Sequence, residues 1–458
     1  MNMMKKRYIA LLGVAFAGLA AYAGSHLIMS SRQQTLPNAV TDAVSPIDSA
    51  FLAEDSLVIK GEYIARTADC IACHTAPGGK EFAGGLAMQT PVGAIYSTNI
   101  TPEADTGIGN YSLSDFVNAV KHGVRKDKSP LYPAMPYPSY TLMPDEDIKA
   151  LYAYFMKKVT PVRQANPSNT LPFWMSMRWP VAYWQMLFSP QREFVPDSTK
   201  DAKINRGAYL VEGPGHCGAC HTPRGLAYQE KAFNMQDNDE FLSGAVVDGW
   251  RAKSLRGEGN GLGEWTTDEL VMFFKTGRTD KTTAFGAMGD VIEHSTQYMT
   301  DDDLMSMSMY LKSLPPVKGR AIERPRQEDK TTDKLLAGSD LSRGALLYTE
   351  YCMTCHRADG KGVSRIFPAL DDNTAVVANN AQSVIQVTLE GSRMADTKHD
   401  RMAFTMPGFE YLGDNDVAEI VNYIRTSWTN NAPKVNAHDV NKVRRFINSK
   451  SAHYVGEK

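Results

Sequence analysis

The chain carries one order of hydrophobic and polar segments three times. Each repeat opens with a helix that has a basic residue and a glycine before an aromatic residue, and a loop and a second helix follow. A helix with acidic residues in its first turn closes each repeat, as the helix dipole favours, and its apolar residues stand at helical spacing. We predict these closing helices over 145–157, 301–314 and 415–428, and Thr300 with Asp303 resembles a capping box at the second.

The same residue types recur at the same places in the three repeats. The opening helices contain the basic-glycine pairs Lys60-Gly61, Arg206-Gly207 and Arg343-Gly344. The second helices are predicted to end in the pairs Gly123 with Arg125, Gly277 with Arg278, and Gly391 with Arg393. Repeated units of constant order indicate repeated domains, so we expect a mainly α chain with three tandem helical domains.

The segments between the repeats differ in composition. We place the domains at 49–162, 202–317 and 338–430, with linkers at 163–201 and 318–337 and a tail at 431–458. Residues 171–189 are rich in Trp, Tyr and Phe, which favours packing between domains; the alternative is contact with a partner or a membrane surface. The charged segment 318–334 is expected to be solvated. The tail is expected to form a short, solvated helix with Val440, Val443, Phe446 and Ile447 on its apolar side, and the alternative is a membrane contact.

The N-terminal sequence predicts export. Lys5, Lys6 and Arg7 precede the apolar run 9–23, and Ala21-Tyr22-Ala23 offers small residues for cleavage. Residues 1–23 therefore form a signal peptide, or residues 8–29 remain as an uncleaved anchor. Beyond this segment no apolar run reaches 18 residues, so the body of the chain is not expected to span a membrane.

Composition excludes several classes. The chain has 458 residues, of which 43% are hydrophobic and 22% charged, which is ordinary for globular domains. Its formal net charge of −2 lacks the basic excess of nucleic-acid-binding proteins.

All six cysteines fall in three Cys-x-x-Cys-His motifs. These motifs are Cys70-Ile71-Ala72-Cys73-His74, Cys217-Gly218-Ala219-Cys220-His221 and Cys352-Met353-Thr354-Cys355-His356. The pattern is typical of covalent c-type haem attachment: both thiols add to one porphyrin, and His74, His221 or His356 offers its imidazole to the iron. A redox dithiol does not require the adjacent His, and zinc sites use pairs much closer together in the chain.

In each repeat, a methionine in the loop after the second helix is a candidate for the second axial ligand, opposite the histidine. A thioether in this position raises the reduction potential of the haem. Met135, Met288 and Met406 are our candidates, because Pro136 and Pro407 stiffen two of these loops and glycines flank the third methionine. Competing side chains are Met143, Met299, Met394, Met402, His122, His216, His294 and His399. Arg125, Arg278 and Arg393 recur at matching places and are candidates for pairing with haem propionates; a solvated surface arginine is the alternative.

Longer segments give the chain a family resemblance. They are Ile95-Tyr96-Ser97-Thr98-Asn99-Ile100-Thr101-Pro102, residues 131–140 around Met135, Gly213-Pro214-Gly215-His216, Ser295-Thr296-Gln297-Tyr298 and Met406-Pro407-Gly408-Phe409. The chain resembles the triheme cytochrome c subunits of bacterial membrane-bound, quinone-dependent dehydrogenases, above all those of quinoprotein alcohol dehydrogenases. The family's methionine ligands map onto Met135, Met288 and Met406. Lys253 departs from the pattern, since the family usually has Pro there.

The resemblance implies an electron-transfer subunit with three covalent haem c groups on the periplasmic side of the inner membrane. A partner subunit with PQQ or FAD would oxidise an alcohol, aldehyde or sugar acid, and ubiquinone would receive the electrons. This chain would then hold no catalytic site for the organic substrate. The alternatives are a stand-alone periplasmic carrier that feeds a terminal oxidase, and a multihaem peroxidase-like enzyme with one open iron.

Overall fold

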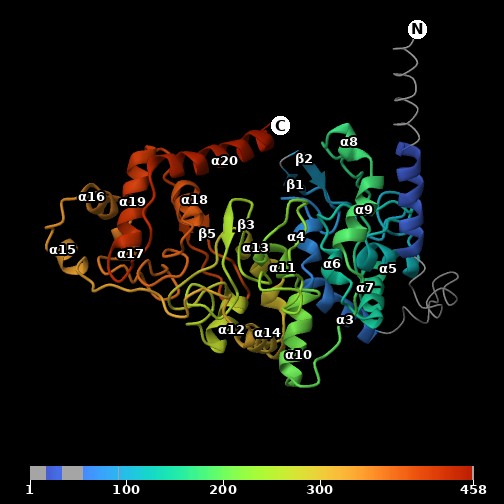
Figure 1. The fold of residues 1–458 in the computed structure, drawn as a ribbon, viewed down its shortest axis with the longest axis horizontal. Coiled ribbons are helices and arrows are strands. Elements are labelled where there is room, and N and C mark those ends of the chain that lie inside the picture. Colours follow the sequence, from blue (N-terminus) through green and yellow to red (C-terminus); the bar gives the residue numbers. More distant parts are fainter. Residues whose placement is uncertain (1–16, 33–54, 91, 456–458) are drawn as a thin grey trace, which may run out of the picture. The chain divides into compact units, whose positions relative to one another are not determined.

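The computed structural model describes residues 17–32, 55–90 and 92–455 (Figure 1). The first part of the expected signal or anchor segment, and the first residues of the first expected domain, lie outside these ranges. The chain divides into unit 1, which comprises residues 1–196 and 212–216, and unit 2, which comprises residues 197–211 and 217–458. Both units are mainly α, as expected, and no helix of the described ranges is long and apolar enough to cross a bilayer.

Unit 1 contains the first Cys-x-x-Cys-His motif. Its described residues 17–32 are helical. The remaining helices are α3 (Asp55–Thr67), α4 (Cys70–His74), α5 (Leu113–His122), α6 (Tyr137–Tyr140), α7 (Asp145–Lys157), α8 (Phe173–Ser176) and α9 (Trp179–Phe188). Strands β1 (Ala87–Thr90) and β2 (Gly93–Tyr96) form an antiparallel pair.

Unit 2 contains the second and third motifs. Around the second motif lie α10 (Ala202–Glu212), α11 (Gly218–His221), β3 (Ala245–Val247), β4 (Trp250–Ala252), α12 (Thr267–Thr276), α13 (Ala287–His294), the 3₁₀ helix η2 (Thr296–Tyr298) and α14 (Asp301–Ser313). Around the third lie α15 (Thr332–Leu336), α16 (Arg343–Tyr351), α17 (Met353–His356), α18 (Gln382–Glu390), β5 (Ser392–Arg393), β6 (Thr405–Met406), α19 (Asp414–Thr426) and α20 (Ala437–Val455). The strands again form short antiparallel pairs, β3 with β4 and β5 with β6.

The opening and closing helices of each repeat are packed in pairs, α3 with α7, α10 with α14 and α16 with α19. The repeated glycine lies at the contact in each pair. A Cβ on Gly61 would come 1.9 Å from the Ala150 carbonyl oxygen, and one on Gly207 would come 2.0 Å from that of Ser306. In the third pair a Cβ on Gly344 would come 2.9 Å from the Cβ of Tyr423. The three glycines therefore permit close backbone approach.

The basic residue before each glycine pairs with an aspartate in the first turn of the closing helix. The N–O distances are 2.7 Å for Lys60–Asp147, 2.8 Å for Arg206–Asp303 and 2.8 Å for Arg343–Asp416. The two arginines make bidentate pairs, the geometry that favours a guanidinium fork. The three helix pairs thus share both a glycine contact and an ion pair.

The second helices end as the sequence predicts. Gly123, Gly277 and Gly391 follow the last residues of α5, α12 and α18, with φ of 65°, 76° and 73°. Glycine adopts this left-handed region without the Cβ penalty of other residues. Thr300 caps α14 by accepting a hydrogen bond from the Asp303 amide.

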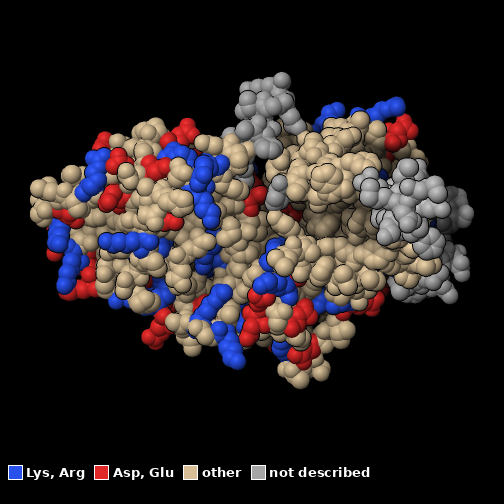
Figure 2. Space-filling view, turned by 45° about the horizontal axis from the view of Figure 1, so that its top comes forward, with Lys and Arg blue, Asp and Glu red and all other residues tan. Residues whose placement is uncertain are grey.

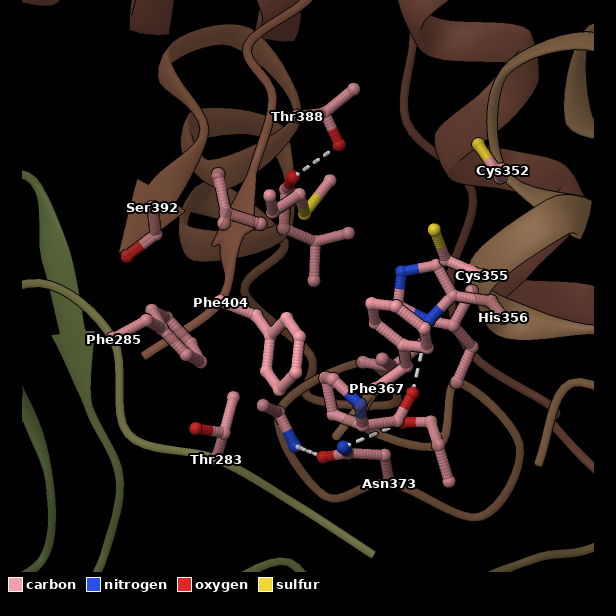
Figure 3. A pocket seen from close by; sticks show the side chains of 18 of the residues that line it. Thr283, Phe285, Cys352, Cys355, His356, Phe367, Asn373, Thr388, Ser392 and Phe404 are labelled. Carbon is pink, nitrogen blue, oxygen red and sulfur yellow. Dashed lines mark hydrogen bonds between the residues drawn. The ribbon is translucent and has the colours of Figure 1, made fainter. Parts of the chain in front are cut away.

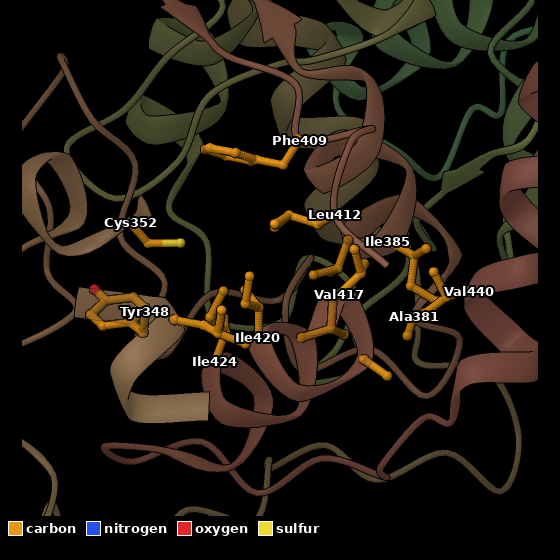
Figure 4. Packing of buried hydrophobic residues seen from close by; sticks show 14 of the residues in the cluster. Tyr348, Cys352, Ala381, Ile385, Phe409, Leu412, Val417, Ile420, Ile424 and Val440 are labelled. Atoms are coloured by element: carbon orange, nitrogen blue, oxygen red, sulfur yellow. The ribbon is translucent and has the colours of Figure 1, made fainter. Parts of the chain in front are cut away.

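The tail differs from the expectation of a solvated helix. Val440, Val443 and Ile447 of α20 are buried in the same apolar cluster as α18 and α19. Figure 4 shows Val440 beside Ala381 and Ile385. The amphipathic spacing predicts the helix correctly, but its apolar side covers the core of the chain's own last repeat.

The two linkers also correct the sequence analysis. Phe173 and Trp174 are 80% and 67% exposed, so the preferred expectation of burial by packing is wrong at these two residues. The other four aromatic residues of the segment are partly buried, namely Trp179, Tyr183, Trp184 and Phe188. In the charged linker Arg324 is buried, and it donates to Glu264 and Asp372. The expectation that 318–334 is fully solvated is therefore wrong at this residue, because its partners come from distant parts of the chain.

Candidate haem sites

Each Cys-x-x-Cys-His motif forms a short helical turn. Cys70 to His74 form α4, and the later motifs form α11 and α17 with the first cysteine at the N-cap. The residues before the first two motifs, Asp69 and His216, have φ of 50° and 36°, which turns the chain sharply into the motif. A helical turn places the two thiols and the imidazole of a motif near one another, as attachment to one porphyrin requires.

The histidine of every motif is oriented by one kind of contact. His74 Nδ1 lies 2.7 Å from the Thr98 carbonyl oxygen, and His221 Nδ1 lies 2.7 Å from that of Lys253. His356 Nδ1 lies 2.9 Å from the Pro368 carbonyl oxygen. A carbonyl can only accept, so Nδ1 carries the proton and the Nε2 lone pair is available to a metal.

Burial keeps these imidazoles neutral. It lowers the pKa of His74 and His356 below the usual value, and it lowers the pKa of His221 to about 4. The hydrogen bonds to the backbone carbonyls raise these pKa values, but by less than burial lowers them. A neutral imidazole with a free Nε2 is the form that ligates iron.

The first cysteine of each motif has the opposite character from a redox-active thiol. Burial is the main cause that raises the pKa of Cys70, Cys217 and Cys352 to about 12. Reactive dithiols of the Cys-x-x-Cys type have lowered pKa values because positive charge surrounds them. Cys70 and Cys352 pack in apolar core clusters, which fits covalent attachment of an apolar macrocycle, whereas Cys73 is exposed.

A deep apolar pocket lies at the third motif. Cys352, Cys355 and His356 line one part of it, and Met406 lines it as well. In Figure 3, Cys355 and His356 face Phe404, Thr388 and Ser392 across the cavity. The pocket therefore brings a candidate His/Met ligand pair and both attachment thiols to one cavity, whose other walls include several aliphatic and aromatic side chains. This donor set fits haem c.

The other two candidate methionines lie in apolar surroundings. Met135 packs against the core cluster of unit 1 that contains Ile71 and Cys70. Met288 packs against a smaller cluster around Ala284 and Ile292. Apolar surroundings do not distinguish a ligand from a core methionine, so both ligand assignments remain predictions.

The competing methionines occupy varied positions. Met143 is fully buried in the unit 1 core, and Met299 is buried as well. Met394 is buried and lines the third pocket, whereas Met402 is 60% exposed. Met394 is therefore the rival that the third site offers to Met406.

Several competing histidines already have other partners. His122 Nδ1 contacts the Gln191 side chain, and His399 Nε2 lies 3.1 Å from the Gln297 carbonyl oxygen. The His216 ring packs edge-on against Tyr140, with centroids 5.7 Å apart.

The three candidate propionate arginines lie in different environments. Arg125 pairs with Asp127 at 3.3 Å, and the half-exposed Arg393 lies 3.5 Å from Glu293. Arg278 is buried. Its Nη1 donates to the carbonyls of Arg365 and Met402, and its Nη2 donates to that of Ala395. Matching sequence positions therefore do not produce matching contacts.

Sequence reasoning missed the carbonyls that orient the histidines. They come from residues 24, 32 and 12 positions after the respective histidine, and any residue type can supply a backbone oxygen. Lys253 is one of these residues, and it departs from the family pattern. Its carbonyl binds His221, and its buried ammonium lies 3.0 Å from Thr374 Oγ1 and 4.7 Å from the Trp265 ring centre.

Comparison with known proteins agrees with this geometry. The Cytochrome c family model matches residues 58–158 and 341–428. The cytochrome c subunit of the quinone alcohol dehydrogenase of Gluconacetobacter polyoxogenes is 49% identical over 403 residues, which cover 86% of this chain and 85% of the relative. The gluconate 2-dehydrogenase cytochrome c subunit of Pantoea cypripedii is 48% identical over 86% of this chain and 90% of its own length. The fructose dehydrogenase cytochrome subunit of Gluconobacter japonicus is 37% identical, over 84% and 82%.

Cys-x-x-Cys-His turns with oriented imidazoles, in a helical chain that matches the Cytochrome c model, define a c-type cytochrome. The chain belongs to the family of cytochrome c subunits of dehydrogenases that includes these three relatives.

Proposed function

We propose that this chain is the triheme electron-transfer subunit of a periplasmic dehydrogenase complex associated with the inner membrane. A catalytic subunit with PQQ or FAD would oxidise an alcohol or a sugar-derived substrate, and ubiquinone would receive the electrons. The relatives named for quinone alcohol, gluconate and fructose dehydrogenases support this class of partner. One observation carries the proposal above all: three motifs each hold a neutral imidazole with Nε2 free.

We assign one domain to each motif, with the boundaries predicted from the sequence. The shared glycine contacts and ion pairs of the three helix pairs support this division. We also propose an exported chain, with 1–23 as a signal peptide or 8–29 as an anchor.

The cysteines of each motif would hold one haem c by thioether bonds. When bound, the haem iron would take up and release one electron at a time. The chain's own residues then define each site. His74, His221 and His356 would bind the iron through Nε2 while Nδ1 donates its proton to a backbone carbonyl, and Met135, Met288 and Met406 would supply thioether ligands. The apolar walls exclude water, which together with the axial ligands tunes the potential of each site.

The test is to quantify haem in the exported chain and to record its reduced and oxidised visible spectra. Three haem groups per chain, a weak far-red methionine band and no reaction of the reduced protein with carbon monoxide are expected. Two haem groups would remove one site from the proposal, and a site that binds carbon monoxide would favour a peroxidase-like enzyme. Copurification from membranes, followed by analysis for PQQ and FAD, identifies the catalytic partner; isolation without any such partner would favour the stand-alone carrier.

A further inference from the structure

The first linker places aromatic side chains on the surface of unit 1. Phe173, Trp174, Met175 and Met177 of the α8 segment are 80%, 67%, 39% and 37% exposed. Val92 at the tip of the β1–β2 hairpin is 43% exposed, and the hairpin pairs with the residues just before α8 through Ala94 and Thr170. We call these five residues, Val92 with the four of the α8 segment, the α8 surface. Four of the five lie within residues 173–177, and exposed apolar residues gathered in this way mark a contact site rather than scattered surface residues.

The backbone of α8 is fixed to unit 1 from its inner side. The Tyr132 hydroxyl donates to the Met175 carbonyl at 2.9 Å. The Arg178 guanidinium stacks over the Tyr132 ring at 4.5 Å and donates to the Pro130 carbonyl at 3.1 Å. Tyr132 and Arg178 thus fix the backbone of the α8 segment to unit 1, and the aromatic side chains of α8 lie on the outside.

The N-terminal helix reaches the same end of the unit. Helix 17–32 runs parallel to α9: the Ala21 carbonyl accepts from the Tyr183 hydroxyl at 2.7 Å, and Arg32 Nη2 donates to the Ser189 carbonyl at 2.7 Å. The start of helix 17–32 therefore lies toward the start of α9, and α8 ends only a few residues before that point in the chain. The uncharged apolar sequence 8–16 directly precedes this helix.

The stretch of sequence that carries α8 is basic, which suits an anionic lipid layer. Between residues 148 and 192 the chain has no Asp or Glu. The same stretch contains the basic residues Lys149, Lys157, Lys158, Arg163, Arg178 and Arg192. Carboxylates from elsewhere in unit 1 act on two of them, since Asp105 pairs with Arg163 at 3.1 Å and Asp127 attracts Arg178. In Figure 2 the face of this part of the molecule is largely free of charged side chains, which gather at its edges. Trp, Phe and Met at a surface flanked by basic residues are typical of membrane interfaces.

We propose that the α8 surface inserts into the headgroup region of the bilayer and orients unit 1 on it. The occupant is lipid, because helix 17–32 reaches this end of the unit and the segment that carries α8 contains basic residues but no carboxylate. The inference rests on the membrane location in the proposed function, but it does not depend on electron transfer.

The test uses the full haem-loaded chain with a nitroxide spin label at Trp174→Cys, and the control carries the label at Leu341→Cys. Leu341 is 75% exposed in unit 2 and lies outside the α8 surface. Each protein is mixed with vesicles of phosphatidylethanolamine and phosphatidylglycerol. The accessibility of the label to oxygen and to a water-soluble nickel chelate is measured by electron paramagnetic resonance, with and without vesicles.

With vesicles, the label at position 174 should become severalfold less accessible to the nickel chelate and more accessible to oxygen, whereas the label at 341 should not change. Equal accessibility with and without vesicles would overturn the proposal. Protection from the nickel chelate in the absence of lipid would also overturn it, because a protein surface would then cover α8. Haem content and spectra are independent of these outcomes and test the proposed function separately.

Discussion

Gly207 of α10 lies so close to Ser306 of α14 that a Cβ in its place would come 2.0 Å from the Ser306 carbonyl oxygen. Gly61 has the same relationship to Ala150 in unit 1. In both helix pairs the basic residue before the glycine pairs with an aspartate of the closing helix, Arg206 with Asp303 and Lys60 with Asp147. The contact explains why a glycine stands after a basic residue in each repeat: the opening helix can approach the closing helix only where no side chain intervenes.

Replacing this glycine should destabilise the protein. In Gly207→Ala the added methyl meets backbone atoms, so the helices must separate, and overpacking of this kind costs about 1–3 kcal/mol or more. Thermal unfolding followed by helix content is the measurement. Gly413→Ala is the matched control because a Cβ at that position would have no other atom within 4 Å. A stability of Gly207→Ala equal to that of this control would contradict the packing argument.

The third site permits a sharp ligand test. Met406→Ala should remove the thioether opposite His356, so that the reduced protein gains one site that binds carbon monoxide, seen in the visible difference spectrum. Met402→Ala is the control, since Met402 is 60% exposed. If Met406→Ala stays unreactive and Met394→Ala becomes reactive, Met394 is the ligand, because it lines the same pocket.

The helices that the sequence specified best are those with strong local signals. The first closing helix, predicted over 145–157, is α7 (Asp145–Lys157), and the other two end within two residues of the prediction. Their acidic first turns and the glycine ends of the second helices are local properties of the chain. The six cysteines and three histidines of the motifs are likewise visible without any tertiary information.

What the sequence did not show depends on distant partners. The strand pairs have two to four residues per strand, too short for an alternating pattern to be recognised. Arg324 is buried only because Glu264 and Asp372, 60 and 48 residues away, converge on it. The surroundings of Arg278 were unpredictable for the same reason, since its acceptors are backbone carbonyls of three separate residues.

Arg278→Met should therefore have a large effect on stability. The substitution leaves the buried carbonyl of Ala395 without its donor, at about 1–3 kcal/mol. It also removes the hydrogen bond to the partly exposed Met402 carbonyl and the ion pair with Asp400 at 3.5 Å. Arg278→Lys should rescue little, because one ammonium cannot replace a planar fork. Denaturant unfolding of the haem-loaded chain is the measurement.

Arg393→Met is the control for this experiment. Arg393 has a side chain that is 55% exposed and pairs with Glu293 and Asp396 at 3.5 and 3.4 Å, so its loss should cost at most about 1 kcal/mol. Equal losses for the two variants would show that the Arg278 contacts do not stabilise the protein.

Acid should release α20 from α19 before the rest of unit 2 unfolds. Asp414 is partly desolvated, which raises the pKa of its carboxyl, but hydrogen bonds from Arg444 and Asn441 prevail and hold that pKa below the usual value. Because the folded-state pKa is lowered, this contribution is present above the unfolded-state pKa and is lost as the pH falls below the usual carboxyl value of 3.8 and through the folded-state value. Hydrogen exchange of α20, corrected for intrinsic rates, should show falling protection over this range.

Asp414→Asn should lower the protection of α20 at neutral pH and flatten its acid dependence. Asp416→Asn is the control: Asp416 is on the same helix but pairs with Arg343, so this variant should leave the protection of α20 unchanged. An acid dependence that survives in Asp414→Asn would assign it to another carboxylate.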